Sequence, residues 1–354
     1  MSACSGTRTL RSRRSRASRR GVAALALVAA LLSPQPVAAQ SKTGTTLGQF
    51  LLIEPSARLT ALGNAGVAVD GGLEAAYYNP AAAGRIERLA LEFTHIDWFA
   101  GIRFDYVAAA LPAGDWGVGF ATLASLNSGE IDVRTVSQPL GTGERYSVSD
   151  LALGLGFSRA ITDRFTAGLH VKYLQETVWH SSARSVTFDV GTLYRVRPNG
   201  LHIGSSLSHF GTEARFSGRD LRLTYDPDPT RYGDNGTLPG ERFVQSYPVP
   251  VLFRVGVGIP WRPAPDWVLW AATEAVHPND NTESVSAGLE ASYRDLVALR
   301  AGYQGLRRQD SEAGLTVGTG LKGRLEAFHY RIDYAWADQG RLGGVHRVTL
   351  QLSY

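Results

Sequence analysis

The 354-residue sequence contains 36 Lys and Arg against 32 Asp and Glu, a formal net charge of +4 at pH 7. Seven of the basic residues and none of the acidic ones lie in residues 1–39, so the rest of the chain is slightly acidic, with 29 basic and 32 acidic residues. This balance excludes a basic nucleic-acid-binding protein. The single cysteine, Cys4, also lies in residues 1–39, which excludes disulfides and cysteine-based metal sites from the remainder.

Residues 1–39 have the organisation of a secretory signal peptide. The basic stretch RTLRSRRSRASRR precedes the apolar run GVAALALVAALL, and SPQPVAAQ then offers small residues for cleavage. The apolar run is shorter than a helix that spans a bilayer. We expect residues 1–39 to be cleaved after Ala39; a retained membrane anchor is the alternative.

The segment 40–88 is rich in Gly and Ala and lacks sustained alternation of apolar and polar residues. Near its end, LEAAYYNPAAAGR predicts a tight elbow built from small residues. Asn79 precedes a proline, which favours an extended backbone, while Pro80 is suited to open a short helix and Gly84 to close one. The elbow would lead directly into the first strand.

From about residue 89 the apolar pattern has a period of two, which predicts β-strands. In FTAGLHVKY, for example, Phe165, Leu169 and Tyr173 share one face while His170 and Lys172 share the other. Most of the segments are 10–13 residues long, the length at which a tilted strand crosses a bilayer. The fourteen expected strands are 89–99, 102–111, 115–125, 149–159, 163–176, 184–196, 200–210, 251–260, 266–276, 284–294, 296–305, 312–321, 324–336 and 344–354.

The connections between these strands differ at the two ends of the expected sheet. Tight turns such as PAGD, ITDR and RPNG alternate with connections that include two long polar loops, 126–148 and 211–250. Short periplasmic turns and long external loops are typical of outer-membrane barrels. The final HRVTLQLSY ends in an aromatic residue and resembles the terminal signal read by the barrel-assembly machinery. The sequence therefore predicts an all-β fold, a 14-stranded antiparallel transmembrane β-barrel over residues 89–354; a soluble β-sandwich or secreted barrel is the alternative.

Charged residues indicate which face of each strand points into the lumen. An Arg or Lys facing lipid near the middle of the bilayer costs about 2–4 kcal/mol. The opposite faces end in aromatic residues such as Tyr173 and Tyr293, candidates for an interfacial girdle. Trp98 and Trp270 could line an apolar pocket or pack the N-terminal segment against the wall. The expected lumen-lining residues are Trp98, Arg103, Asp105, Lys172, Asp189, Arg254, Trp270, Glu274, Glu290, Arg300, Arg331 and Asp333.

A lumen of fourteen strands is wider than one that wall side chains alone can fill. Residues 40–88, with short helical pieces expected near 55–62 and 72–78, are therefore predicted to form a hatch or plug. EPSARLTALGNAGVAVDGGLEAAYYNPAAAG resembles the N-terminal signature of the PorV/PorQ family, which combines an Ala-Arg…Ala-Leu-Gly stretch with an aromatic-Asn-Pro-Ala motif. The likeness continues through SDLALGLGFSRAITDRFTAGLHVKYLQE and the closing DYAWADQGRLGGVHRVTLQLSY.

This family is similar to the FadL-like fatty-acid transporter barrels, which have fourteen strands and an N-terminal hatch bearing an Asn-Pro-Ala motif. By that resemblance Tyr78, Asn79, Pro80 and Ala81 take the hatch positions. Tyr78 stands where the motif often has tryptophan, a departure that leaves the assignment intact.

Motifs for catalysis or cofactor binding are weak, and we expect no enzyme activity, no cofactor and no metal. GTGLKG at 318–323 matches a dinucleotide fingerprint, but it lies on an expected strand followed by a turn rather than before a helix. The cluster Asp226, Asp228, Asp234 and Asn235 departs from the spacing of a calcium loop, which leaves calcium binding as the lesser alternative. A Ser-His hydrolase is disfavoured because no G-x-S-x-G is present.

The resemblance implies an outer-membrane accessory in the export or surface delivery of secreted proteins, in a type IX-like system. Loops 126–148 and 211–250 would then contact the cargo protein. The alternative is passive transport of hydrophobic small molecules or fatty acids across the bacterial outer membrane. The expected partners are outer-membrane lipid, the barrel-assembly machinery, and either secreted cargo proteins or hydrophobic small molecules.

Overall fold

The computed structural model describes residues 43–197, 200–228, 230, 237–306, 308 and 311–354. The expected signal peptide lies outside the described residues. Residues Ser41–Tyr354 form one compact unit, to which both the N-terminal segment and the strands belong.

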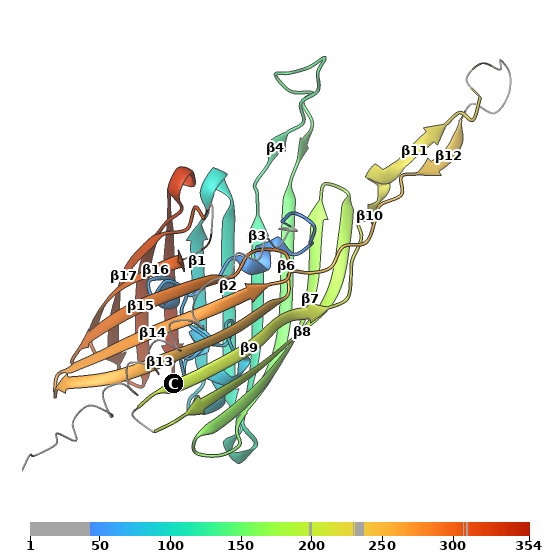
Figure 1. Ribbon diagram of the computed structural model, residues 1–354. Coiled ribbons are helices and arrows are strands. Elements are labelled where there is room, and N and C mark those ends of the chain that lie inside the picture. The colour runs from blue at the N-terminus through green and yellow to red at the C-terminus, as the bar shows by residue number, and fades with distance from the viewer. Residues whose placement is uncertain (1–42, 198–199, 229, 231–236, 307, 309–310) are drawn as a thin grey trace, which may run out of the picture. The chain divides into compact units, whose positions relative to one another are not determined.

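Fourteen antiparallel strands of this unit pair in chain order and close into a barrel (Figure 1). The first and last strands complete the wall, with Ala90 opposite Ser353 and Asp97 opposite His346. The predicted 14-stranded antiparallel barrel is thereby confirmed. Its strands are β1 (Ala90–Asp97), β2 (Arg103–Pro112), β3 (Val118–Asn127), β6 (Val148–Ala160), β7 (Phe165–Val178), β8 (Ser181–Arg195), β9 (His202–Gly211), β13 (Leu252–Ala264), β14 (Trp267–Pro278), β15 (Ser284–Tyr293), β16 (Val297–Leu306), β17 (Leu315–Leu325), β18 (Phe328–Asp338) and β19 (Gly344–Ser353).

Alternation along each strand separates a buried inner face from an exposed apolar outer face. In β8, Thr187 and Asp189 are buried whereas Val186, Phe188 and Val190 are exposed. A soluble protein would bury such large apolar side chains, whereas a wall that faces lipid exposes them. The outward belt is therefore typical of a barrel that spans a bilayer.

The connections at the two ends of the barrel are unequal. At the short-turn end, strands are joined by residues 113–117, 161–164, 196–201, 265–266, 294–296 and 326–327. At the long-loop end, the β3–β6 connection contains the hairpin β4 (Ile131–Asp132) and β5 (Arg145–Tyr146). The β9–β13 connection contains β10 (Ser217–Gly218), β11 (Arg222–Tyr225) and β12 (Leu238–Glu241). Only β10 joins the barrel sheet, by pairing with β8; the β4–β5 and β11–β12 hairpins stand outside the wall (Figure 1).

The N-terminal segment before β1 forms short helices and no strand among the described residues. They are η1 (Gln49–Leu52), α2 (Ala57–Thr60), η2 (Leu73–Ala75) and η3 (Pro80–Arg85), and single turns η4 (Phe99–Gly101), η5 (Gly114–Trp116), η6 (Arg219–Leu221) and η7 (Gly340–Leu342) lie in later connections. Ser56 caps α2 by accepting a hydrogen bond from the Leu59 N–H, and η3 opens at Pro80 but ends at Arg85 rather than at Gly84. Among the described residues, no helix is long and apolar enough to cross a membrane.

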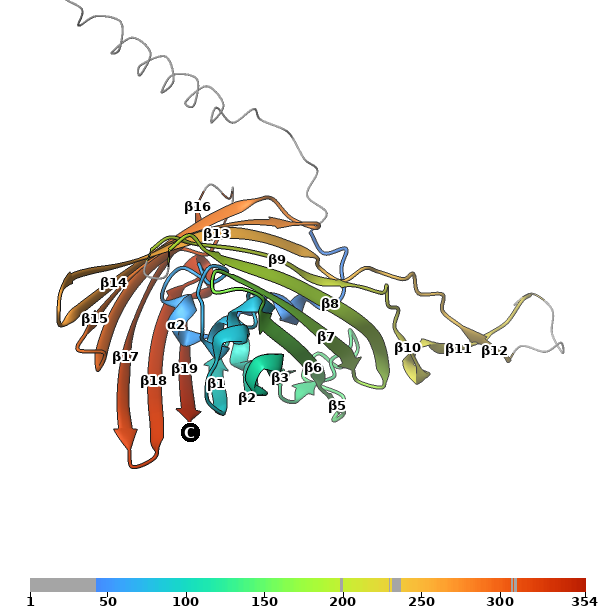
Figure 2. The same ribbon diagram turned by 90° about the horizontal axis from the view of Figure 1, so that it is seen from below.

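The segment containing these first four helices, residues 43–88, is named the plug here. Its side chains form much of the buried core: Leu51, Leu59, Leu62, Leu73 and Tyr78 are fully buried. Helix α2 lies beside β18 and β19 (Figure 2). Helix η3 contacts β6, β7 and β8. The plug is thus held against two different parts of the inner wall.

Candidate functional site

The Asn-Pro elbow fixes the plug to the wall at β7 and β8. The buried side chain of Asn79 donates from Nδ2 to the carbonyls of Val67 (2.8 Å) and Thr192 (3.0 Å), and its Oδ1 accepts the N–H of Ala81 at 3.0 Å. All the hydrogen-bonding groups of the amide are therefore used, and they tie the plug to itself and to β8. Tyr78, the preceding residue, is fully buried and donates to Asn64 Oδ1 at 3.0 Å.

Two wall glycines permit this close approach. A Cβ at Gly168 would lie 2.5 Å from the carbonyl carbon of Pro80, and a Cβ at Gly191 would overlap the Asn79 side chain and lie 2.9 Å from Pro80 Cδ. A side chain at either position would displace the elbow. The wall is therefore shaped around Asn79 and Pro80.

A closed ring of charges fastens the plug to the other side of the wall. Arg58 of α2 contacts Glu74 of η2 (2.8 Å) and Glu290 of β15 (2.9 Å). Glu290 contacts Arg300 of β16 (2.5 Å), and Arg300 contacts Asp333 of β18 (2.8 Å). We call Arg58, Glu74, Arg331, Asp333, Arg300 and Glu290 the charge ring.

Arg331 of β18 closes the charge ring. It contacts Asp333 at 2.7 Å and the plug's Glu74 at 2.9 Å, distances that define ion pairs, although its Nε and Nη2 lack hydrogen-bond geometry. The ring alternates three guanidiniums with three carboxylates, so its formal charge is balanced. Burial by itself would raise the pKa of Glu74, but Arg331 and Arg58 hold that pKa well below its usual range. Glu74 is therefore ionised whenever the plug is in place at neutral pH.

A second buried ion pair joins the plug to β13 and β14. Arg254 donates from Nη2 to Glu54 Oε1 of the plug at 2.7 Å, and its Nε lies 3.3 Å from Glu274 Oε1. Glu274 also accepts the backbone N–H of Val67 at 2.8 Å. Burial raises the pKa of Glu54, an effect that the Arg254 and Arg347 charges only partly offset. These pairs add to the charge ring in linking plug and wall.

The remaining expected lumen residues fall into three groups, of which two lie on the inner side of the wall. Lys172 and Asp189 are buried and lie 2.6 Å apart, with His170 beside them. Trp98 and Trp270 are half-buried and pack on the core; the Arg347 guanidinium lies 5.4 Å from the Trp98 ring centre.

The prediction that Arg103 and Asp105 line the lumen is wrong. They lie on the opposite face of β2 from the buried Phe104 and Tyr106, and so point outward. Asp105 contacts His95 Nδ1 at 2.7 Å on that face. Both residues stand at the end of β2 next to the long-loop connections, where an outward charge reaches water at lower cost than at mid-bilayer. The rule that charges point inward fails at the ends of strands.

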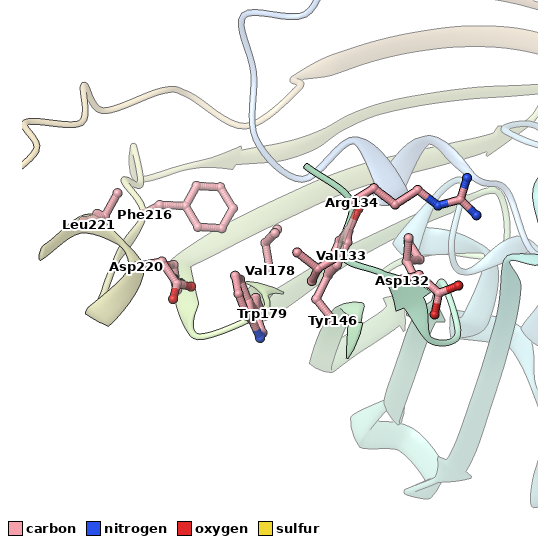
Figure 3. A pocket seen from close by; sticks show the side chains of 11 residues that line it. Asp132, Val133, Arg134, Tyr146, Val178, Trp179, Phe216, Asp220 and Leu221 are labelled. Atoms are coloured by element: carbon pink, nitrogen blue, oxygen red, sulfur yellow. Dashed lines mark hydrogen bonds between the residues drawn. The ribbon is translucent and has the colours of Figure 1, made fainter. Parts of the chain in front are cut away.

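An apolar cleft of about 740 Å³ lies at the long-loop end. Three connections that are far apart in sequence supply its side chains, and Figure 3 shows Phe216 pointing toward Val178 and Val133. Trp179, in the turn between β7 and β8, lies beside Tyr146, with ring centres 6.4 Å apart and ring planes tilted by 47°. We call this the loop cleft; its principal residues are Val133, Tyr146, Val178, Trp179, Phe216 and Leu221.

The backbone around the loop cleft is held in an unusual conformation. Trp179 has φ = 55°, a left-handed value that few residues other than glycine adopt, and its N–H donates to the Ser147 carbonyl at 3.1 Å. Asp220 of η6 accepts the backbone N–H of His180 at 2.9 Å and contacts its Nδ1 at 3.0 Å. The β9–β13 connection is thereby fastened over the β7–β8 turn.

The loop cleft could not be predicted from the sequence. Its apolar residues are dispersed over three connections, and without the register of β10 on β8 nothing places Phe216 near Val178. The one available signal was Trp179, a large aromatic residue between two expected strands.

The glycine motif at 318–323 and the acidic loop cluster do not form a cofactor or metal site among the described residues. In GTGLKG, Gly318 and Gly320 lie on the inner face of β17, where Gly320 adjoins Arg300 and Asp333. Across the part of the chain that the structure describes, no three His, Cys, Asp or Glu side chains form a group that could hold a metal ion. Asp234 and Asn235 of the acidic loop lie outside the described residues.

The fold and the loop cleft invite comparison with known barrels. No protein-family model matches the chain, and no curated protein matches it in sequence. Solved structures do share its fold. The TodX deltaS2S3 mutant monoaromatic hydrocarbon channel has a TM-score of 0.54 at 14% identity, covering 84% of this chain and 98% of that one.

Two further solved structures share the fold at slightly lower TM-scores. The Pseudomonas putida toluene transporter TodX has a TM-score of 0.50 at 14% identity, with coverage of 83% of this chain and 96% of that chain. The CymD monoaromatic hydrocarbon channel has a TM-score of 0.50 at 11% identity, with coverage of 85% and 97%. The chain therefore has the fold of the hydrocarbon-channel barrels over nearly their whole length.

Proposed function

We propose that the protein is a passive channel for hydrophobic small molecules in the bacterial outer membrane. The loop cleft carries this proposal, because it offers an apolar cavity to molecules arriving at the long-loop end of a plugged barrel. The similar structures are named as a toluene transporter and monoaromatic hydrocarbon channels, which supports the same substrate class for this chain. The proposed cleaved signal peptide and barrel-assembly machinery would deliver it to that membrane. No catalytic group is needed.

The volume of the loop cleft bounds the substrate. Ligand pockets of about 300–1,000 Å³ hold small to drug-sized molecules, and the cleft, at about 740 Å³, falls inside that range. Its lining is mostly apolar and aromatic, so neutral aromatic or aliphatic compounds suit it better than sugars or ions. Passage beyond the cleft requires the plug to shift, since its residues fill the barrel core.

Uptake of radiolabelled toluene tests the proposal. Cells that carry the protein should accumulate toluene faster than cells carrying an empty vector, most clearly at low concentration. Replacing Trp179→Ser together with Phe216→Ser removes the principal apolar surface of the cleft. We expect the initial rate to fall about tenfold, or about 1.4 kcal/mol, because both side chains are partly exposed and give a bound ligand only part of the contact of a fully buried residue.

Val136→Ser is the matched control, because Val136 lies in the β3–β6 connection, is 103% exposed and does not line the cleft. This variant should transport like the wild type. Uptake no faster than in the vector control, with the barrel folded in the membrane, would contradict the proposal.

A role in protein export, implied by the PorV/PorQ resemblance, is a second candidate. The β11–β12 hairpin favours it, because this hairpin stands outside the wall and Tyr225 and Phe243 nearby are 54% and 87% exposed. Removing residues 222–241 would then deplete specific proteins from the cell surface while leaving toluene uptake intact. An unchanged surface and secreted proteome would exclude this role.

A further inference from the structure

A second cavity lies at the opposite end of the barrel from the loop cleft. It measures about 460 Å³ and is bounded by the 294–296 turn and the ends of β17, β18 and β19. We call it the short-turn pocket. Its polar lining is dominated by basic residues: Arg294, Lys322, Arg324, His329 and Arg331, with Asp295 as the acidic member.

The register of β17 and β18 sets basic side chains directly opposite each other in this pocket. Lys322 pairs with Arg331, and Arg324 pairs with His329. All four lie on the inner phase of their strands, the same phase as the buried Gly320 and Asp333. Like charges at directly opposed positions destabilise a sheet. The pair Lys322 and Arg331 is of this kind, so this end of the sheet requires compensation by negative charge.

The protein supplies that compensation only in part. Lys322 Nζ lies 2.5 Å from Asp295, and Arg331 is engaged by the charge ring. Arg324, in contrast, donates from Nε to a neutral group, the backbone carbonyl of Glu326, at 2.9 Å. The outermost opposed pair, Arg324 and His329, therefore faces the cavity without a carboxylate among the contacts described.

We propose that the short-turn pocket is a binding site for an anionic group, a phosphate or carboxylate, presented from the periplasmic side. A planar guanidinium beside an ammonium suits the oxygens of such groups, and charge-assisted hydrogen bonds are the strong ones. The group belongs either to a free small anion or to the headgroup of an anionic phospholipid. This site goes beyond hydrophobic transport, because it lies at the other end of the barrel and its lining favours charge.

Titration of the purified, folded barrel with inorganic phosphate by isothermal calorimetry tests the site, with a parallel measurement in lipid nanodiscs with and without phosphatidylglycerol. We expect saturable binding of one of these probes. Arg324→Gln should weaken it about tenfold, the loss expected for one charge-assisted hydrogen bond. His329→Gln provides a second variant should Arg324→Gln fail to fold.

Arg262→Gln is the matched control, since Arg262 is an exposed arginine near the short-turn end of β13 that does not line the pocket. Binding of phosphate in detergent identifies a free anion, and binding of phosphatidylglycerol alone identifies a headgroup; both support the site. If neither probe binds, or if Arg262→Gln weakens binding as much as Arg324→Gln does, the proposal is overturned. Toluene uptake measured on Arg324→Gln keeps the two proposals separate, because loss of the anion site leaves the loop cleft intact.

Discussion

The plug touches the barrel wall in two contrasting ways. At β7 and β8, neutral groups and close backbone packing hold Asn79 and Pro80 against wall glycines. At β15, β16 and β18, the charge ring holds Arg58 and Glu74 by ion pairs. The first contact lies next in the chain to β1, so the plug is covalently anchored there. The second contact lies earlier in the chain, on short helices with no strand to fix them.

This difference suggests how a plug can be tight and yet movable. Close packing has one good geometry and resists sliding. Buried ion pairs are strong only while every partner is present, and the loss of one member leaves an uncompensated charge. We infer that the Asn79 contact acts as a hinge and the charge ring as a latch. Variants in the two contacts should therefore have different consequences.

Breaking the latch should have the largest effect. Glu74→Gln leaves Arg58 and Arg331 without a shared carboxylate, at a cost of about 3–5 kcal/mol to the closed plug. We expect frequent open-channel events for the variant in planar bilayers, where the wild type is mostly closed. Glu312→Gln, which removes the half-buried partner of the exposed Arg341 at the long-loop end, is the control and should behave like the wild type. If the two variants conduct alike, the ring is no latch.

Adding a side chain at the hinge should cost less free energy than breaking the latch, but it should displace the elbow at Asn79 permanently. Gly191→Val places a side chain where Asn79 sits, and overpacking of this kind costs about 1–3 kcal/mol. We expect a lower thermal stability of the folded barrel together with a constant leak rather than brief openings. Gly119→Val offers the comparison, because a Cβ at Gly119 meets nothing within 4 Å. Equal stability of the two variants would show that the elbow does not depend on the glycine.

The barrel could be predicted from the sequence because its signal is local. Alternation over ten or more residues survives in each strand, and the cost of a charge in lipid decides which face turns inward, as Arg254 and Arg300 illustrate. The fourteen expected strands correspond to the fourteen observed strands, with shifts of a few residues at their ends. Arg103 and Asp105 are exceptions to the expectation that charged residues face the lumen. They lie at a strand end, where an outward charge costs less than at mid-bilayer.

The two cavities could not be predicted because each depends on register and on loop packing. Trp179 and Phe216 meet only through the pairing of β10 with β8, a two-residue contact without a sequence signature. In the same way, the sequence around Lys322 and Arg324 is typical of an ordinary basic turn, and only the register of β17 on β18 shows which residues lie opposite them. The four wall residues of the charge ring were expected to face the lumen, but their ion pairs were not predicted. Arg58 and Glu74 of the plug were missed because nothing in the sequence relates them to β15 or β18.

Reversible locking of the plug tests the central claim most directly. The Ala57 N–H donates to Thr349 Oγ1 at 3.0 Å, which places these two residues side by side, so Ala57→Cys with Thr349→Cys is the pair chosen for a disulfide between α2 and β19. We predict that the oxidised double variant takes up toluene no faster than the vector control and that reduction restores uptake, while Thr349→Cys alone responds to neither treatment. Wild-type uptake by a fully oxidised double variant would contradict passage past a movable plug.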